Sequence, residues 1–239
     1  MSPRTRLLLI FGVLVVLTVV VDVWRRLRVE ARHDAIILAA AGRNSVDAAL
    51  IKAVIWRESR FDASARGSKG EIGLMQILPR AAGAEWAQAR KIQNFSEATL
   101  ANPAQNVDCG AWYLGKLLAR YRATDNPVAF ALADYNAGRS NALKWMAGAG
   151  STNSEIFIQQ ITFGSTQRYV RAVIRRKLRY DAWAARQHQK KILVRQMHVL
   201  GDVSPGTETH FGYESASASE VVRDFVRHAT CRAHQSFGG

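Results

Sequence analysis

Glu58 is the residue of this sequence that is best suited to acid–base chemistry. It ends an apolar helical pattern in which Leu50, Val54 and Glu58 recur every four residues, so the three side chains lie on one face of the predicted helix. Partial burial and the negative end of the helix dipole both raise the pKa of a carboxyl group placed there. A carboxylic acid that is still protonated near neutral pH is what a general acid requires. The alternative interpretation is a solvated glutamate at a helix end, paired with Arg57 or Arg60.

Two further stretches carry polar side chains in apolar surroundings. The first is GLMQ at positions 73–76, where Gln76 offers both an amide donor and an acceptor. Because a buried amide without a partner is costly, we expect Gln76 to face a polar ligand or another side chain. The second is Tyr135-Asn136, a phenol and an amide at the end of a predicted helix, where a cleft could use them.

Helical patterns run through nearly all of the sequence from Ser45 onward, and they set the positions of these residues. Ser45 is the predicted N-cap of the first helix, while Asn102-Pro103 and Asn126-Pro127 pair a capping residue with a proline at the first helical position. Gly138 is expected to close the preceding helix in a left-handed cap. No alternating apolar and polar stretch indicates a strand, although residues 62–72 could form a short irregular hairpin. We therefore predict an all-α fold, a compact bundle of about six to eight short helices.

The N-terminal residues 7–21 form an uncharged apolar run preceded by Arg4 and Arg6. As a helix this run rises about 23 Å, and Trp24 extends it toward the thickness of about 30 Å of a bilayer's hydrocarbon core. A signal peptide also has a basic start followed by an apolar segment, but the residues after Val21 lack the small-residue pattern of a cleavage site. We therefore favour an uncleaved signal anchor and expect the chain to be exported. The excess of arginine that follows the run is at odds with the positive-inside rule: Arg25, Arg26, Arg28 and Arg32.

The net charge of +14 favours a polyanionic partner, which could be nucleic acid, a membrane surface or an acidic polysaccharide. Residues 168–195 alone hold ten lysines and arginines against a single acid, Asp181. Nucleic acid would require a cytoplasmic chain and a recognisable binding motif, and neither is evident, so we expect no nucleic-acid partner.

Two cysteines, Cys109 and Cys231, are present. After export they could form a disulfide, or Cys109 could be a small side chain of the core. Two distant cysteines and six scattered histidines offer no metal-ligand spacing, so no metal site is expected.

Three motifs together resemble the signature of the lytic transglycosylase (SLT) family, whose fold is lysozyme-like and whose more distant relatives are the goose-type lysozymes. The motifs are Glu58-Ser59, Gly73-Leu74-Met75-Gln76 and Tyr135-Asn136-Ala137-Gly138, in the order and spacing of the family. Asn102-Pro103 with Asn106, and Thr166 with Tyr169, also fit the family pattern. The resemblance spans residues 46–181, over half of the chain.

The resemblance implies a cofactor-free enzyme that cleaves the β-1,4 bond between N-acetylmuramic acid and N-acetylglucosamine in peptidoglycan. Ordinary glycosidases use two carboxylates, whereas Glu58 would here act alone. It would protonate the glycosidic oxygen and then take the proton of the C6 hydroxyl, which attacks C1 and leaves a 1,6-anhydro end. The substrate-binding residues that the resemblance implies are Ser59, Met75, Gln76, Tyr135, Asn136 and Tyr169.

The chain then divides into four regions. Residues 1–24 are the signal anchor, 25–44 a juxtamembrane linker helix, 45–186 the catalytic domain and 187–239 a C-terminal extension. We expect part of the extension to be disordered, because residues 201–219 are rich in Gly, Ser, Thr and Pro. The expected partners are peptidoglycan strands and the inner membrane, with the catalytic domain in the periplasm of the cell envelope.

Three positions depart from the family pattern: Gly67 stands where serine is usual, Glu71 where a small residue is usual, and Ser165 where glutamate is common. Glu71 or Asp62 would supply the second carboxylate if the chain were a hydrolytic muramidase of the same fold. A non-catalytic peptidoglycan-binding or assembly protein is a further alternative. A housekeeping enzyme and one that opens the wall for a secretion or conjugation apparatus would share all of these features.

Overall fold

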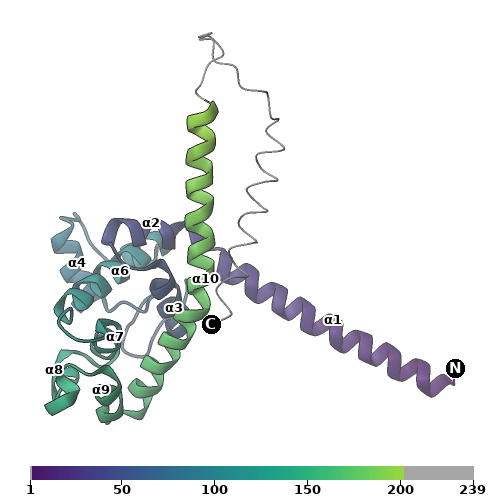
Figure 1. The fold of residues 1–239 in the computed structure, drawn as a ribbon, viewed down its shortest axis with the longest axis horizontal. Helices are drawn as coiled ribbons and strands as arrows, with labels where there is room; N and C mark the ends of the chain where they lie inside the picture. The colour runs from purple at the N-terminus through teal and green to yellow at the C-terminus, as the bar shows by residue number, and fades with distance from the viewer. Residues whose placement is uncertain (1, 202–239) are drawn as a thin grey trace, which may run out of the picture. The chain divides into compact units, whose positions relative to one another are not determined.

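The computed structural model describes residues 2–201, which form helices joined by loops (Figure 1). Residues as far as Ile192 belong to one compact unit. The elements, of which η1 is a π-helix and η2 a 3-10 helix, are α1 (Pro3–Ala31), α2 (Asp34–Asn44), α3 (Ala48–Glu58), η1 (Pro79–Gly83), α4 (Ala84–Ala89), α5 (Glu97–Ala101), α6 (Pro103–Arg120), α7 (Pro127–Ala137), α8 (Arg139–Trp145), η2 (Gly148–Ser151), α9 (Ser154–Gln160) and α10 (Gly164–Gly201). Cys231 and most of the predicted C-terminal extension lie outside the described residues.

No β-strand occurs among residues 2–201, which confirms the predicted all-α fold. Two isolated bridges join Arg66 to Ile72 and Ile72 to Ile77. The first bridge closes the irregular hairpin predicted at residues 62–72, in which the Gly67 amide also donates to the Glu71 carbonyl at 2.9 Å.

Helix α3 carries Glu58 as its last residue, and its start is set by Asp47 rather than by Ser45. The Asp47 side chain accepts a hydrogen bond from the Ala49 amide at 2.8 Å. Ser45 instead adopts a left-handed conformation, with φ 53°, that ends α2. The predicted cap was therefore wrong by two residues, because the chain uses Ser45 to turn between two helices. Residues 49–55 are all buried, so α3 runs through the core toward Glu58.

Helix α6 packs against α2 and α7. Its start follows the prediction: Asn102 Oδ1 accepts from the amides of Ala104 and Gln105 at 3.0 and 3.2 Å, and Pro103 occupies the first turn. On its partner α2, Ile37 and Ala40 are fully buried. Part of the segment predicted as a linker, residues 34–44, therefore belongs to the packed core.

Helix α7 ends at Gly138, whose φ of 81° and ψ of 157° place it in a region that side chains rarely adopt. The positive φ agrees with the prediction, but the extended ψ means that the chain leaves the helix without a left-handed turn. The Gly138 amide still donates to the Asp134 carbonyl at 2.7 Å. Glycine at this position lets α8 begin at Arg139, directly after the end of α7 that carries Tyr135 and Asn136.

Helix α10 begins with core residues and continues well past residue 183, where the predicted helix ends. Tyr169, Val170 and Val173 in its first turns are buried. The part of α10 beyond the core is strongly basic, as the composition of residues 168–195 indicates. The first turns of α10 therefore place Tyr169 against the C-terminal end of α3 and Thr166 against the C-terminal end of α7.

Helix α1 is apolar on all sides over residues 7–21. Its large apolar side chains from Leu7 to Trp24, Leu9 apart, expose between 45% and 70% of their surface. A soluble helix hides such side chains in a core, but the described residues offer α1 no such cover. By length and composition α1 is able to cross a membrane, a test that a signal sequence near the N-terminus also passes.

Candidate active site

Glu58 lies at the C-terminal end of α3 with its side chain largely removed from solvent. Burial raises the pKa of this carboxyl from 4.5 to about 7, and the nearby Glu71 carboxylate acts in the same direction. A hydrogen bond from Tyr169 and the charge of Arg57 partly oppose that shift. Within the described residues Glu58 forms no ion pair with Arg57 or Arg60. The arrangement therefore favours the buried proton donor over the solvated helix-end glutamate.

Tyr169 on α10 is the hydrogen-bond partner of Glu58. Its hydroxyl donates to Glu58 Oε1 at 2.6 Å across 111 residues of sequence. Tyr169 is fully buried, and burial raises the pKa of its phenol well above the usual value. The phenol therefore stays protonated and holds Oε1, while Oε2 accepts no hydrogen bond from the described residues.

Ser59, predicted to bind substrate, instead fixes the loop of the second motif. Its hydroxyl donates to the Leu74 carbonyl at 2.8 Å, and its side chain is buried. This bond ties the residue after Glu58 to the loop at 72–76. Ser59 therefore contributes to the site through the position of that loop.

The loop at 72–76 is held from its other side by Asn106 on α6. Asn106 accepts from the Met75 amide at 2.9 Å and donates to the carbonyls of Ile72 and Leu100 at 2.8 and 2.9 Å. Gly73 has a φ of 73°, and a Cβ there would lie 2.6 Å from Asn106 Nδ2. Glycine at position 73 is thus required both by the backbone conformation and by the close approach of Asn106.

Met75 and Gln76 contribute to the site in different ways. The Met75 side chain is fully buried against Gly110, so the prediction that it contacts substrate is not supported by its position. Gln76 is partly exposed, with its amide nitrogen donating to the carbonyls of Gly73 at 2.9 Å and Ala65 at 3.3 Å. Among the described residues its partners are backbone carbonyls and not another side chain. The amide oxygen of Gln76 accepts no hydrogen bond from the described residues.

Tyr135 and Asn136, at the end of α7, join the same region. The Tyr135 hydroxyl donates to the Met75 carbonyl at 2.8 Å, and the charge of Glu58 is among the causes that raise the pKa of its phenol, after burial. Asn136 is exposed, and its Oδ1 accepts from Thr166 on α10 at 2.8 Å. The three motifs thus meet at one place, where α10 contacts two of them through Tyr169 and Thr166.

Two residues outside the predicted site set belong to this arrangement. Thr166, which fits the family pattern, orients Asn136. Tyr113 on α6 lies with its ring 5.7 Å from that of Tyr135. No sequence pattern marks Tyr113, since it is one of several aromatic residues on an ordinary amphipathic helix.

The two candidate second carboxylates differ in their surroundings. Asp62 is exposed and accepts hydrogen bonds from the amide and hydroxyl of Ser64 at 2.8 and 2.6 Å, which lower its pKa. Glu71 accepts from the Lys69 amide at 2.8 Å and lies near enough to Glu58 to affect its pKa. A Cβ added to Gly67 would lie 2.2 Å from Glu71 Oε2, so the two departures from the family pattern occupy one space.

Cys109 is a core residue of α6, with its thiol directed to the Ala82 carbonyl at 3.7 Å, and burial raises its pKa strongly. Cys231, the other cysteine of the disulfide that the sequence left open, lies outside the described residues. Within residues 2–201, no group of three or more His, Cys, Asp or Glu side chains gathers as a metal site would require.

Comparison with known proteins gives one family and several relatives. The sequence model of the family described as "Transglycosylase SLT domain" matches residues 35–158. The membrane-bound lytic murein transglycosylase C of Histophilus somni is 35% identical over 118 residues, which are 47% of this chain and 32% of that protein. The soluble lytic murein transglycosylase of Escherichia coli K12 is 31% identical over 133 residues, 55% of this chain and 19% of that protein. The chain thus spans about a third or less of the length of these relatives.

Two solved structures share the fold. An inactive mutant of the lytic transglycosylase Slt from Pseudomonas aeruginosa has a TM-score of 0.57 and 28% identity, covering 62% of this chain and 24% of that one. The 70-kDa soluble lytic transglycosylase of Escherichia coli has a TM-score of 0.56 and 22% identity, covering 63% of this chain and 24% of that one. The predicted lysozyme-like helical fold is confirmed by these matches.

Proposed function

Because the chain belongs to the transglycosylase SLT domain family, we propose that it is a peptidoglycan lytic transglycosylase with Glu58 as its single catalytic carboxylate. The observation that carries the proposal is the state of Glu58: buried at the end of α3, with a pKa raised to about 7 and its Oε1 held by Tyr169. A group with that pKa is both acid and base near neutral pH, which a one-carboxylate mechanism requires.

In the first step, protonated Glu58 donates its proton to the glycosidic oxygen between N-acetylmuramic acid and N-acetylglucosamine. The bond from that oxygen to C1 breaks, and the N-acetyl oxygen of the substrate stabilises C1. In the second step, the C6 hydroxyl oxygen forms a bond to C1 while the Glu58 carboxylate takes the proton of that hydroxyl. Glu58 regains its proton, no water is consumed, and the product ends in 1,6-anhydro-N-acetylmuramic acid. The attack is intramolecular, which replaces the activation of a separate nucleophile.

Tyr169 serves both steps. Its hydrogen bond fixes the orientation of the carboxyl group, so the proton to be transferred sits on Oε2. After the transfer the same bond stabilises the negative carboxylate, as its lowering effect on the Glu58 pKa indicates. Burial raises the pKa of Glu58 and this hydrogen bond lowers it, and their balance keeps that pKa near 7.

The sugar would be positioned by the exposed polar groups that surround Glu58. Asn136, oriented by Thr166, and the unoccupied amide oxygen of Gln76 are the groups best placed to bind it. Tyr135 links the third motif to the loop of the second through the Met75 carbonyl and so fixes the spacing between them.

We also propose that α1 stays on the protein and anchors it to the inner membrane, with the catalytic domain in the periplasm. The apolar surface of α1, exposed on all sides, and the lack of a cleavage pattern after Val21 support this. N-terminal sequencing of the membrane fraction tests it. A mature chain that starts between Val23 and Ala40 would contradict anchoring but not export.

Product analysis tests the activity. The full chain is incubated with purified sacculi, and the released muropeptides are weighed by mass spectrometry. Anhydro ends, lighter by one water than reducing ends, are expected. Reducing ends would favour the muramidase with a second carboxylate, and binding without release would favour the non-catalytic alternative.

A further inference from the structure

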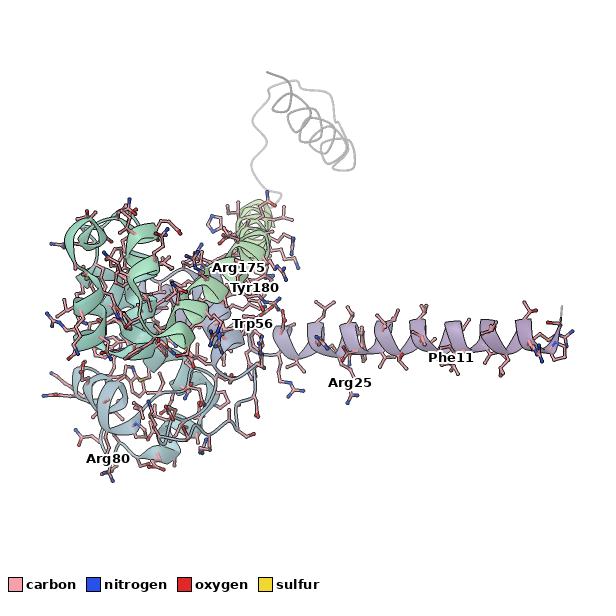
Figure 2. All side chains as sticks on the ribbon, turned by 90° about the horizontal axis from the view of Figure 1, so that it is seen from below. Phe11, Arg25, Trp56, Arg80, Arg175 and Tyr180 are labelled. Atoms are coloured by element: carbon pink, nitrogen blue, oxygen red, sulfur yellow. The ribbon has the colours of Figure 1, made fainter. Side chains whose placement is uncertain are left out.

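A hollow lined by basic side chains lies where the end of α1 meets α3 and α10. Its volume is about 600 Å³, and its lining includes Arg25, Arg26, Trp56, Arg60 and Arg176. We call these five residues the arginine pocket. Trp56 is its centre: the guanidinium of Arg60 lies 3.8 Å from the Trp56 ring and that of Arg176 lies 4.7 Å from it. Figure 2 labels Trp56 beside Arg175 and Tyr180, near the end of α1.

The positive charge of the arginine pocket exceeds the negative charge that faces it. Arg176 pairs with Glu30, which also accepts from Tyr180 at 2.9 Å, and Arg26 pairs with Asp22 at 2.7 Å. Glu30 and Asp22, the two acids near the pocket, are thus each already paired with one arginine.

Arg25 and Arg60 form no ion pair with any described residue. Burial, followed by the charges of Arg57 and Arg176, lowers the pKa of Arg60. A smaller hollow of about 110 Å³ shares Trp56 and Arg176 and adds two further arginines, Arg175 and Arg179. The surface is therefore built to accept an anion.

The position of the pocket on α1 indicates which anion. Arg25 and Arg26 follow directly after Trp24, the last residue of the apolar segment. Since an α-helix rises about 1.5 Å per residue, the two arginines lie within about 8 Å of Val21 along the helix axis. If α1 crosses the bilayer, Arg25 and Arg26 lie at the depth of the lipid phosphates, where tryptophan is also favoured.

We propose that the arginine pocket binds the phosphate headgroup of an anionic phospholipid in the leaflet from which α1 emerges. The proposal rests on the proposed membrane anchoring, and not on catalysis. Guanidinium groups bind phosphate through paired N–H donors, and several arginines converging on one hollow suit a phosphodiester. Carboxylates of peptidoglycan peptides share the charge, but they do not lie at the depth of Arg25 and Arg26.

Two consequences follow from headgroup binding. It explains the arginines after the apolar run, which the positive-inside rule places on the wrong side, because Arg25 and Arg26 are ligands rather than topology signals. It also orients the catalytic domain, because Trp56 and Glu58 lie on the same last turn of α3. A lipid held at Trp56 would fix Glu58 at a defined height above the membrane.

The test measures lipid binding by the full chain in a neutral detergent, by native mass spectrometry with short-chain phosphatidylglycerol as the probe. Phosphatidylcholine of the same chain length, inorganic phosphate and a peptidoglycan stem peptide are the competitors. The variant is Arg25→Gln/Arg60→Gln, because neither arginine has an ion-pair partner to disturb. The matched control is Arg80→Gln, which removes one exposed arginine from η1, outside the pocket (Figure 2).

We expect phosphatidylglycerol to bind in preference to all three competitors. Each arginine near a membrane surface is worth about five-fold in affinity, so the double variant should bind at least about five-fold more weakly. Arg80→Gln should stay within about two-fold of the unmodified chain. If the double variant unfolds, Arg25→Gln alone, on the exposed face of α1, should still show the loss of about five-fold.

Equal binding of phosphatidylcholine, an equal loss in Arg80→Gln, or tighter binding of the stem peptide or of free phosphate would overturn the proposal. The measurement needs no catalysis, so the Glu58→Gln chain should bind the lipid as the unmodified chain does. A failure of lipid binding therefore leaves the proposed activity untouched, and a failure of the sacculus digestion leaves the lipid proposal untouched.

Discussion

Replacing Tyr169 by phenylalanine removes one hydrogen bond and tests the electrostatic balance at Glu58. The Tyr169 hydroxyl donates to Glu58 Oε1 at 2.6 Å and favours the charged carboxylate. Without it, burial acts almost unopposed, and the pKa of Glu58 must move up from its value of about 7. The ring of Tyr169 is fully buried, so phenylalanine keeps the packing.

The size of the shift follows from the strength of that bond. A hydrogen bond to a charged group contributes about 1.5–3 kcal/mol net. Part of it would be replaced by water or substrate in the variant, which leaves about 1.4 kcal/mol, or about one pKa unit. Because the first step needs protonated Glu58, the alkaline limb of kcat/KM should move to higher pH by about one unit. The plateau should fall by about ten-fold, since the carboxyl group is no longer oriented.

The assay is the pH profile of kcat/KM for release of anhydro-muropeptides, between about pH 5 and pH 9, which reports the free enzyme. Tyr180→Phe is the matched control, because Tyr180 lies on the same helix and donates to a different carboxylate, Glu30, at 2.9 Å. Its alkaline limb should stay where it is. An alkaline limb that stays in place or moves to lower pH in a folded Tyr169→Phe enzyme would refute the role given to this hydrogen bond.

Four further predictions concern the same region. Glu58→Gln should lose at least about 10⁴-fold in activity, because one group serves as acid and base, while Glu71→Gln should keep most of it; an inactive Glu71→Gln would instead support the muramidase. The folded pKa of Glu58 is raised from 4.5 to about 7, so the burial of this carboxyl costs no stability below about pH 4.5 and a growing amount up to about pH 7. Relative to the unmodified chain, Glu58→Gln should therefore gain about 3 kcal/mol in the free energy of unfolding between pH 4 and pH 8, as denaturant unfolding would measure. Gly67→Ser should displace the Glu71 carboxylate, whose Oε2 lies 2.2 Å from the position of the new Cβ, and cost about 1 kcal/mol. In the Glu71→Ala background the carboxylate is gone but the Cβ at 2.9 Å remains, so the cost of Gly67→Ser should be smaller there without vanishing. Strictly additive effects in the double-mutant cycle would show that the two positions are independent. Gly73→Ala should cost about 3 kcal/mol in thermal or denaturant unfolding, from its positive φ and the displaced Asn106; a loss below about 1 kcal/mol would mean that the loop relaxes freely.

The local features of this protein could be predicted from the sequence because they depend on neighbours in the chain. The spacing of Leu50, Val54 and Glu58 determines one face of α3, and Asn102-Pro103 begins α6 as expected. The raised pKa of Glu58 was predicted in direction for the same reason: a carboxyl that continues an apolar stripe is buried with it. The cap of α3 was misplaced because Ser45 and Asp47 are both good capping residues, and only the turn from α2 decides between them.

The partners of the site residues were decided by the tertiary structure alone. Tyr169 reaches Glu58 across 111 residues, and no local pattern encodes which side chain of α10 packs on the end of α3. Ser59 and Met75 belong to the family motifs, yet both make contacts within the protein. The Ser59 hydroxyl donates to a carbonyl of the tight loop, because buried carbonyls need hydrogen-bond donors, and the Met75 side chain is buried in the core. The arginine pocket likewise joins α1, α10 and the segment from Trp56 to Arg60. The sequence shows the excess of basic residues in α1 and α10, but only their packing around Trp56 gathers the charge in one hollow.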